Sequence, residues 1–307
     1  MNAHITDGDT GRLRDWVLSD TPQSRRQAAI GAAYRGWLQF RRNWLAMTGL
    51  TVLLVLFALG ISAPQLATHD PNAQDLAQRL AAPSAAHWFG TDQLGRDLFS
   101  RLLYGARITL GMAVLIVAIV APVGMLMGTI AGFAGGWTDR ILMRVTDVFL
   151  AFPKLVLALA FVAALKPGLT SVVFAIALTA WPPYARLARA ETLAIRHADF
   201  ISAIRLTGAS PVRIILRHVM PLCVSSVIVR VALDISGIVL TAAGLGFLGM
   251  GAQAPSPEWG AMIASTRGFI LQQWWVPTIP GIAIFTASLA FNLLGDGLRD
   301  VFDPKSE

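Results

Sequence analysis

Charged residues inside otherwise apolar segments are the positions where this sequence could do chemistry away from water. Asp147 and Lys154 stand two helical turns apart, and Arg230 and Asp234 stand one turn apart. An ionised side chain at the centre of a bilayer costs about 2.5–3.5 kcal/mol on insertion scales. Arg230 and Asp234 are predicted to form a structural ion pair. Asp147 and Lys154 are predicted either to line a polar pathway or to extend toward the membrane interface.

The residue patterns of several catalytic classes are absent. No lysine follows the glycine-rich run that a phosphate-binding loop requires, and no Gly-x-Ser-x-Gly nucleophile motif occurs. The single cysteine, Cys223, lies in an apolar run, and the five histidines show no metal-ligand spacing along the sequence. The sequence therefore predicts no catalytic residue, no metal site and no cofactor in this chain.

The elements that carry these residues are predicted to be membrane-spanning helices. Of the 307 residues, 55% are hydrophobic and 14% are charged, whereas a soluble globular protein has about 25% charged residues. A helix of about 20 apolar residues crosses the hydrocarbon core and pairs all its backbone groups internally. We therefore predict an all-α integral membrane protein with six transmembrane helices, near residues 44–63, 108–132, 146–165, 169–186, 219–247 and 275–294.

Lysine and arginine residues indicate which side of the membrane each loop faces, because they are enriched on the cytoplasmic side. Most of them lie before the first predicted helix, between the second and third helices, between the fourth and fifth helices, and after the sixth. These four segments all face the same side of the membrane. Both termini are therefore predicted to be cytoplasmic. The predicted regions are a cytoplasmic leader with a flexible start (residues 1–43), the first helix (44–63) and an outer loop (64–106). A five-helix core (107–295) follows, with a cytoplasmic loop at 187–218, and the chain ends in a cytoplasmic tail (296–307).

The outer loop is too long to be a simple connection, since most helix–helix connections have only a few residues. It carries Asp92, Arg96 and Asp97, and Arg107 follows directly after it. Two interpretations remain open. The segment is either a solvated loop with an interfacial helix, or a docking surface or gate that faces the exterior.

The cytoplasmic loop at 187–218 is also long, and it is predicted to form two short helices. Asp199 begins the first helix, and Gly208 ends it as a residue in the left-handed region. Ser210 and Pro211 begin the second helix as its N-cap and first residue. The apolar side chains of the first helix lie outside any predicted span. It is therefore expected to lie on the membrane or in the groove of a partner.

A glycine stripe runs along the second predicted span. Gly124, Gly128 and Gly132 recur every four residues, which places them on one helix face. Glycine at these positions lets another backbone approach closely. The stripe predicts a helix–helix contact and no chemistry.

The cytoplasmic loop resembles that of permease subunits in ATP-binding-cassette (ABC) importers. The family pattern is Glu-Ala-Ala, three residues, Gly, nine residues and Ile-x-Leu-Pro. Ala203, Gly208 and Pro221 match this pattern, whereas Ser202 replaces its glutamate. The resemblance implies that the loop docks on an ATPase through a segment that includes Asp199, Ser202, Ala203, Arg205, Gly208 and Pro221.

Further motifs resemble the dipeptide, oligopeptide and nickel group of these permeases. They lie at residues 90–97, 104–107, 245–251, 257–260 and 291–300. Together the matches cover about residues 40–305 and are typical of the C-type partner in a two-permease pair. The resemblance implies a type I importer permease fold in a bacterial inner membrane.

The resemblance also implies the partners and the substrate class. The chain would form the translocation pathway of an ATP-driven importer for di- or oligopeptides together with a second permease. Two ATPase subunits would bind ATP and Mg, and a periplasmic or lipoprotein binding protein would dock near residues 92–107 and Glu258-Trp259. The alternative substrates are nickel chelates and glutathione-like molecules. An ion-driven secondary transporter is a less favoured alternative, because no internal repeat is detected. No nucleic-acid partner is expected.

Overall fold

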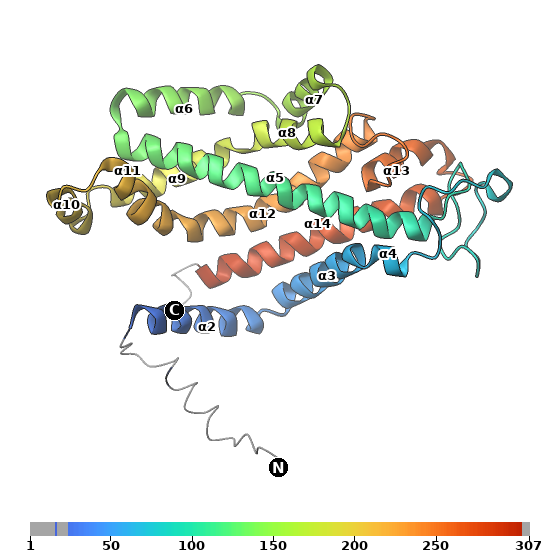
Figure 1. Ribbon diagram of the computed structural model, residues 1–307, viewed down its shortest axis with the longest axis horizontal. Coiled ribbons are helices and arrows are strands. Elements are labelled where there is room, and N and C mark those ends of the chain that lie inside the picture. The colour runs from blue at the N-terminus through green and yellow to red at the C-terminus, as the bar shows by residue number, and fades with distance from the viewer. Residues whose placement is uncertain (1–15, 17–23, 303–307) are drawn as a thin grey trace, which may run out of the picture.

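The computed structural model describes residue 16 and residues 24–302, and this part of the chain is helical apart from loops and one isolated β-bridge. The helices form an elongated bundle (Figure 1). One end carries the loop 67–97 and is called the loop end. The other end carries α10 (Asp199–Leu206) and is called the α10 end. The all-α prediction is confirmed, while the predicted flexible start of the leader lies outside the described residues.

Four described helices are long and apolar enough to cross a membrane. In Figure 1, α5 and α14 run through the middle of the bundle with α12 between them, and α3 lies beside α14. Uncharged sequence favours helix here because each backbone N–H and C=O finds its partner within the segment. The four spans are Trp44–Ile61 (α3), Leu98–Ala134 (α5), Pro211–Phe247, which ends in α12 (Met220–Phe247), and Trp275–Val301 within α14 (Trp275–Phe302).

The span predicted near 146–165 is not one continuous helix. The chain forms α6 (Gly136–Leu150) and α7 (Lys154–Leu165), which are bent by 91° relative to each other. Pro153 explains the break, because proline lacks an N–H and disfavours helical geometry in the residue before it. The bend also places Asp147 and Lys154 on different helices, so they do not share a helix face. Counting the bent pair as one span gives up to five spans among the described residues, and the count of six stays a prediction.

The predicted helix at 169–186 is also interrupted. α8 (Leu169–Ala180) ends before Trp181, and α9 (Pro182–Ile195) then runs along α5 toward the α10 end (Figure 1). The glycine stripe of α5 faces α9. A Cβ atom on Gly124 would lie 2.7 Å from the carbonyl oxygen of Trp181, and one on Gly132 would lie 2.8 Å from Cβ of Thr192. The close contact predicted for the stripe is therefore present.

Two predicted boundaries shift by several residues. α5 begins at Leu98, within the predicted outer loop, because the Asp97 side chain caps it by accepting from Ser100 N–H at 2.8 Å. α14 continues through Phe302, so the first part of the predicted tail is helical. The remaining short elements are α4 (Ala63–Leu66), α11 (Pro211–Ile214), a π-helical turn (Ile215–Val219), α13 (Trp259–Thr266) and 3₁₀ turns at Leu76–Gln78 and Arg267–Phe269.

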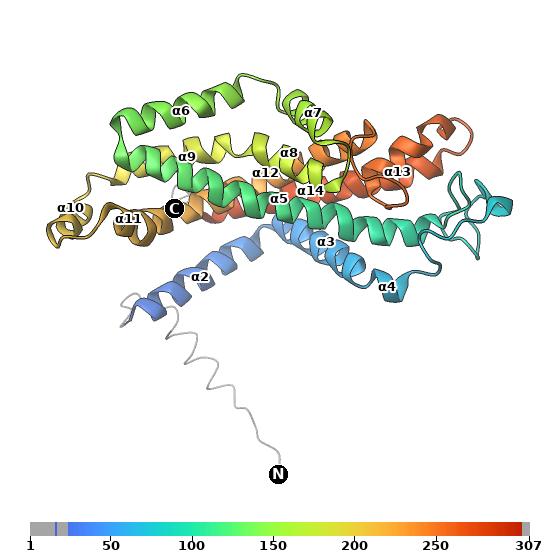
Figure 2. The same cartoon turned by 45° about the horizontal axis from the view of Figure 1, so that its top comes forward.

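The predicted leader contains α2 (Arg25–Arg42), which diverges from the bundle in Figure 2. Its end is tied to the end of α14, since the Asn43 side-chain amide donates to the Asp300 carboxylate at 3.0 Å. Phe40 is buried at the same junction. In Figure 1 the described beginning and end of the chain both lie toward the α10 end. This is the arrangement expected if the two termini share one side of the membrane.

Candidate functional site

The α10–α11 segment projects from the α10 end of the bundle (Figure 1). A small apolar cluster joins it to the following helix, since Ile201 of α10 and Ile214 of α11 pack with Val219 and with Cys223 of α12. Other apolar side chains of the projection are turned outward, and Leu206 is 90% exposed. An exposed apolar surface at the end of a bundle favours contact with a partner or with lipid. The other outward side chains are those of Phe200, Val212 and Leu216.

Local sequence explains the shape of the projection. Gly208 ends α10 with φ of +79°, a conformation that residues with a Cβ rarely adopt. The Ser210 hydroxyl then accepts from Arg213 N–H at 3.4 Å and caps α11, and Pro211 is its first residue. The two short helices predicted from the sequence are therefore present.

The sequence-predicted docking residues do not all lie on the projection. Asp199, Ser202, Ala203 and Arg205 are exposed on α10, whereas Pro221 is exposed in the first turn of α12. Arg205 places its guanidinium 4.9 Å from the ring centroid of Phe133, at the end of α5. The resulting cation–π contact connects the projection to the bundle.

Ion pairs connect α9 to α6 close to the projection. Arg189 donates to both carboxylate oxygens of Asp139 at 2.5 and 2.6 Å, which is the bidentate geometry that makes such pairs strong. Arg186 donates to Asp147 at 2.7 Å. The partner of Asp147 is therefore Arg186, and α6 and α9 are joined at two points.

The intramembrane pair predicted on α12 is present. Arg230 Nε donates to Asp234 Oδ2 at 2.8 Å, one turn along the helix. Both side chains are partly exposed, and Arg230 lines a cavity of about 320 Å³ with Glu191 and Arg299. In the same region the Ser226 hydroxyl donates to Glu191 at 2.8 Å. A polar surface among apolar helices is thus available for a pathway or a second subunit.

At the loop end, most of the predicted docking residues are buried and brace the loop. Arg96 Nε donates to Asp92 Oδ2 at 2.6 Å, and both side chains are nearly inaccessible. Arg101 also approaches Asp92, and its guanidinium donates to the carbonyl oxygen of Pro71 at 2.7 Å. The side chains of Asp92 and Arg96 are therefore turned into the loop, whereas Arg107 is exposed. Both interpretations of this segment, a solvated loop and a docking surface or gate, stay predictions.

Glu258 and Trp259 are buried as well, where they fix α13 to α5. The Glu258 carboxylate accepts from the N–H groups of Gly260 and Ala261, each at 2.8 Å, and so caps α13. Burial raises the pKa of Glu258, although these hydrogen bonds oppose the change. Trp259 Nε1 donates to the carbonyl oxygen of Leu102 at 3.0 Å. A cavity of about 380 Å³ lies nearby, lined by residues that include Gln93, Arg96, Arg101, Phe247 and Arg267.

A histidine cluster that the sequence did not indicate lies beside this bracing network. The loop end brings His69 and His87 together with Asp97. Burial alone would raise the pKa of Asp97, but hydrogen bonds from Ser100 and His87 outweigh that effect and lower it. The three residues are far apart in sequence, so only the fold of the loop reveals them.

Comparisons with known proteins identify relatives along most of the chain. Residues 124–307 match the family described as binding-protein-dependent transport system inner membrane component. Residues 34–83 match the N-terminal TM domain of oligopeptide transport permease C.

Three relatives illustrate the range of described functions. The probable D,D-dipeptide transport system permease protein of Escherichia coli K12 is 44% identical over 92% of this chain and 94% of its own length. The dipeptide transport system permease protein of Alkalihalophilus pseudofirmus is 40% identical over 92% of this chain and 93% of its own length. A glutathione transport system permease protein of Escherichia coli O6:K15:H31 is 44% identical over 92% of this chain and 97% of its own length.

A solved structure shares the fold. An inward-facing conformation of the MetNI methionine ABC transporter aligns with a TM-score of 0.54 and 18% identity. The alignment covers 67% of this chain and 98% of the aligned chain. This similarity shows the fold alone.

Proposed function

The chain belongs to the family of inner-membrane permease components of binding-protein-dependent ABC importers, and we propose that it is the C-type permease subunit of a peptide importer. The observation that carries the proposal is identity of 40–44% with dipeptide and glutathione permeases over more than nine tenths of the chain. Di- or oligopeptides are the proposed substrates. Glutathione is itself a small peptide, so a glutathione-like substrate is the second candidate.

The proposed division of labour leaves ATP hydrolysis to other subunits. The chain would build the translocation pathway with a second permease, while two ATPase subunits bind ATP and Mg. A binding protein would deliver substrate at the loop end. Support comes from the family name, which specifies dependence on a binding protein, and from the missing phosphate-binding loop.

The α10–α11 projection is the proposed contact with the ATPase. Its exposed apolar side chains and the fixed turn at Gly208 suit a helix held in a partner's groove. Movement of the projection would pass to α9, which packs along the spanning helix α5. It would also pass to α6, because Arg189 and Arg186 of α9 pair with Asp139 and Asp147 of α6. A rigid-body rotation of packed helices could then alternate access to the pathway.

The pathway itself is proposed to run along the face that carries the intramembrane charges. Arg230 lines a cavity on α12 and pairs with Asp234, and Asp147 and Lys154 lie on the two arms of the bent α6–α7 pair. Charged groups in membrane proteins usually face a water-filled cavity or another protein chain. The exposed Arg107 is the proposed contact for the binding protein at the loop end.

The proposed ATPase contact predicts a selective effect of charge on the projection. In a complex co-expressed with its partner subunits, Leu206→Glu should release the ATPase, because it places a charge on an apolar contact. Loss of one central contact costs about 2 kcal/mol or more, roughly 30-fold in affinity. The measurement is the amount of ATPase that co-purifies with the tagged chain.

Leu271→Glu is the matched control, since Leu271 is 89% exposed but lies beyond α13 toward the other end of the bundle. It should retain the ATPase. Equal retention of ATPase by both variants would contradict the assignment of the contact.

A further inference from the structure

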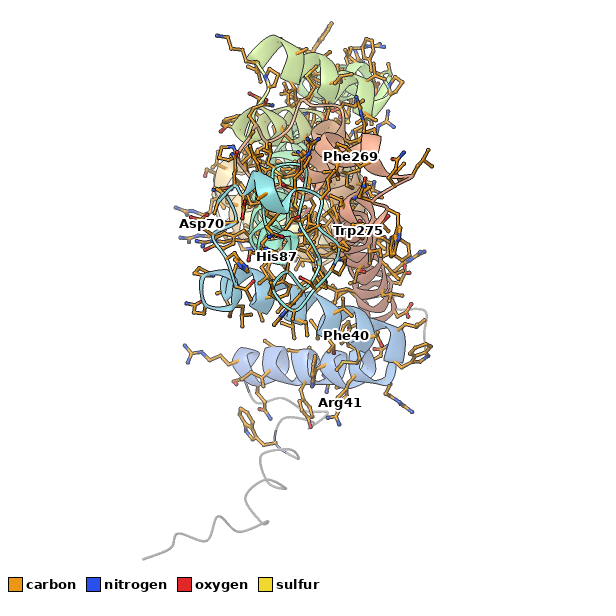
Figure 3. All side chains as sticks on the ribbon, turned by 90° about the vertical axis from the view of Figure 1, so that its right-hand side faces the viewer. Phe40, Arg41, Asp70, His87, Phe269 and Trp275 are labelled. Carbon is orange, nitrogen blue, oxygen red and sulfur yellow. The ribbon has the colours of Figure 1, made fainter. Side chains whose placement is uncertain are left out.

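Three side chains with metal-binding atoms meet in the loop end. His69 follows α4, His87 lies in the loop 67–97, and Asp97 precedes α5. Their ligand atoms all lie within 4.8 Å of one another. Figure 3 looks onto this end and shows His87 near the middle of the end face, with Asp70, the neighbour of His69, at its edge. Two imidazoles and a carboxylate form a ligand set that zinc commonly takes.

The distances suit a tetrahedral ion. His87 Nδ1 lies 2.9 Å from Asp97 Oδ1, and His69 Nδ1 lies 3.8 Å from the same oxygen. Neighbouring ligand atoms around a tetrahedral zinc ion are ~3.4 Å apart, given bonds of about 2.0–2.2 Å. The two separations from Asp97 bracket that value, and the ligand atoms of the two histidines lie within 4.8 Å of each other, so side-chain rotations would bring all three atoms to bonding distance.

Each ligand is held by its own surroundings. Asp97 uses Oδ2 to cap α5, which leaves Oδ1 directed at the two rings. The His69 backbone N–H donates to the hydroxyl of Ser100 at 3.1 Å. The His87 backbone N–H donates to the hydroxyl of Ser84 at 3.2 Å. Ligands fixed by hydrogen bonds to their surroundings lower the cost of assembling a metal site.

Charge balance also favours a cation here. The Asp97 side chain is 1% exposed, and among the described residues its ion-pair partners within 4.0 Å are the two histidines and no lysine or arginine. The two imidazole rings lie 4.6 Å apart, centroid to centroid, on the same side of this carboxylate oxygen. A divalent cation placed between them would pair with the carboxylate and bind the nitrogen of each ring.

One coordination position would stay open. The His69 side chain is 42% exposed and borders a cavity of about 580 Å³. That cavity also contacts Thr68, Asp70 and Tyr104. Zinc with three protein ligands keeps its fourth position for water or another molecule.

We propose that His69, His87 and Asp97 form a site for a divalent metal ion of the zinc class, with an open position toward this cavity. The ion would tie His69 and His87 of the loop to Asp97, the N-cap residue of α5. The site is independent of the ATPase contact and of the transported substrate. A hydrogen-bonded His–Asp brace without metal affinity is the opposing outcome.

Zinc titration of the full chain, purified in nanodiscs with a tag that contains no histidine, tests the site. Competition with a chromophoric chelator should show one tight site in the unchanged protein. His69→Ala and Asp97→Asn should each weaken it at least tenfold, since even indirect supports of metal sites are worth about 10–100-fold. His197→Ala is the control, because His197 lies near α10 and contacts Arg196 instead of the cluster. The zinc affinity of the His197→Ala variant should match that of the unchanged chain.

Folding defects are separated from ligand loss in two ways. Asparagine is as good an N-cap as aspartate, so Asp97→Asn keeps the start of α5. Cobalt added in place of zinc should give the visible absorption of a tetrahedral site in the unchanged chain and in His197→Ala only. Equal zinc affinity in all four proteins, or no binding by the unchanged chain, overturns the proposal.

Discussion

Gly128→Val should leave little correctly folded protein in the membrane. A Cβ atom at this position would overlap the carbonyl oxygen of Ala185 and lie 2.9 Å from Cβ of Ala188. Both obstacles belong to α9, whose contact with α5 is central to the bundle, and a backbone oxygen cannot rotate away. Overpacking of a tight interior costs about 1–3 kcal/mol and sometimes more, a large part of a total stability of ~5–15 kcal/mol.

Thermal unfolding followed by size-exclusion chromatography in detergent measures this effect. The variant should show a lower midpoint and several-fold less monodisperse protein than the unchanged chain. Gly111→Val is the matched control in the same helix, since nothing lies within 4 Å of a Cβ atom there. Similar losses in both variants would mean that valine in α5, and not the α9 contact, causes the defect.

Gly208→Val should reduce transport strongly while leaving the protein folded. The φ of +79° at Gly208 costs a residue with a Cβ about 1–2 kcal/mol, which corresponds to roughly 5–30-fold in the population of the native turn. No neighbouring atom lies within 4 Å of an added Cβ, so the cost is conformational and local. The expected consequence is a changed direction of α10 relative to α11 and weaker coupling to the ATPase.

Two assays on one preparation measure this outcome. Uptake by the reconstituted complex should fall about as far as the population of the native turn, whereas thermal stability of the spanning bundle should be nearly unchanged. Gly208→Asn should retain much of the uptake, because asparagine tolerates the left-handed region. Normal uptake by Gly208→Val would remove the projection from the coupling mechanism.

Local signals in the sequence were sufficient for part of the fold. The projection could be predicted because Gly208, Ser210 and Pro211 each determine the backbone of a neighbouring residue. The Arg230–Asp234 pair could be predicted because helix geometry places residues four apart on one face. The contact of the glycine stripe followed from the same periodicity, although its partner, α9, did not.

Other features depend on three-dimensional packing and escaped prediction. Proline inside an apolar run can bend a helix or merely occur in it, and only the structure shows the 91° break near Pro153. Charged loop residues are normally exposed, yet Asp92 and Arg96 are buried because they satisfy each other and the surrounding backbone. The cluster of His69, His87 and Asp97 depends on how the loop folds back on itself, which no spacing rule records.

Uptake of a labelled dipeptide by proteoliposomes tests the central claim most directly. The complete complex, with both permeases, the ATPase subunits and the binding protein, should accumulate the peptide when ATP is inside the vesicles with the ATPase. Vesicles that contain only the two permeases should accumulate none, with or without an ion gradient. Accumulation by the permeases alone, driven by a gradient and without ATP, would contradict the account.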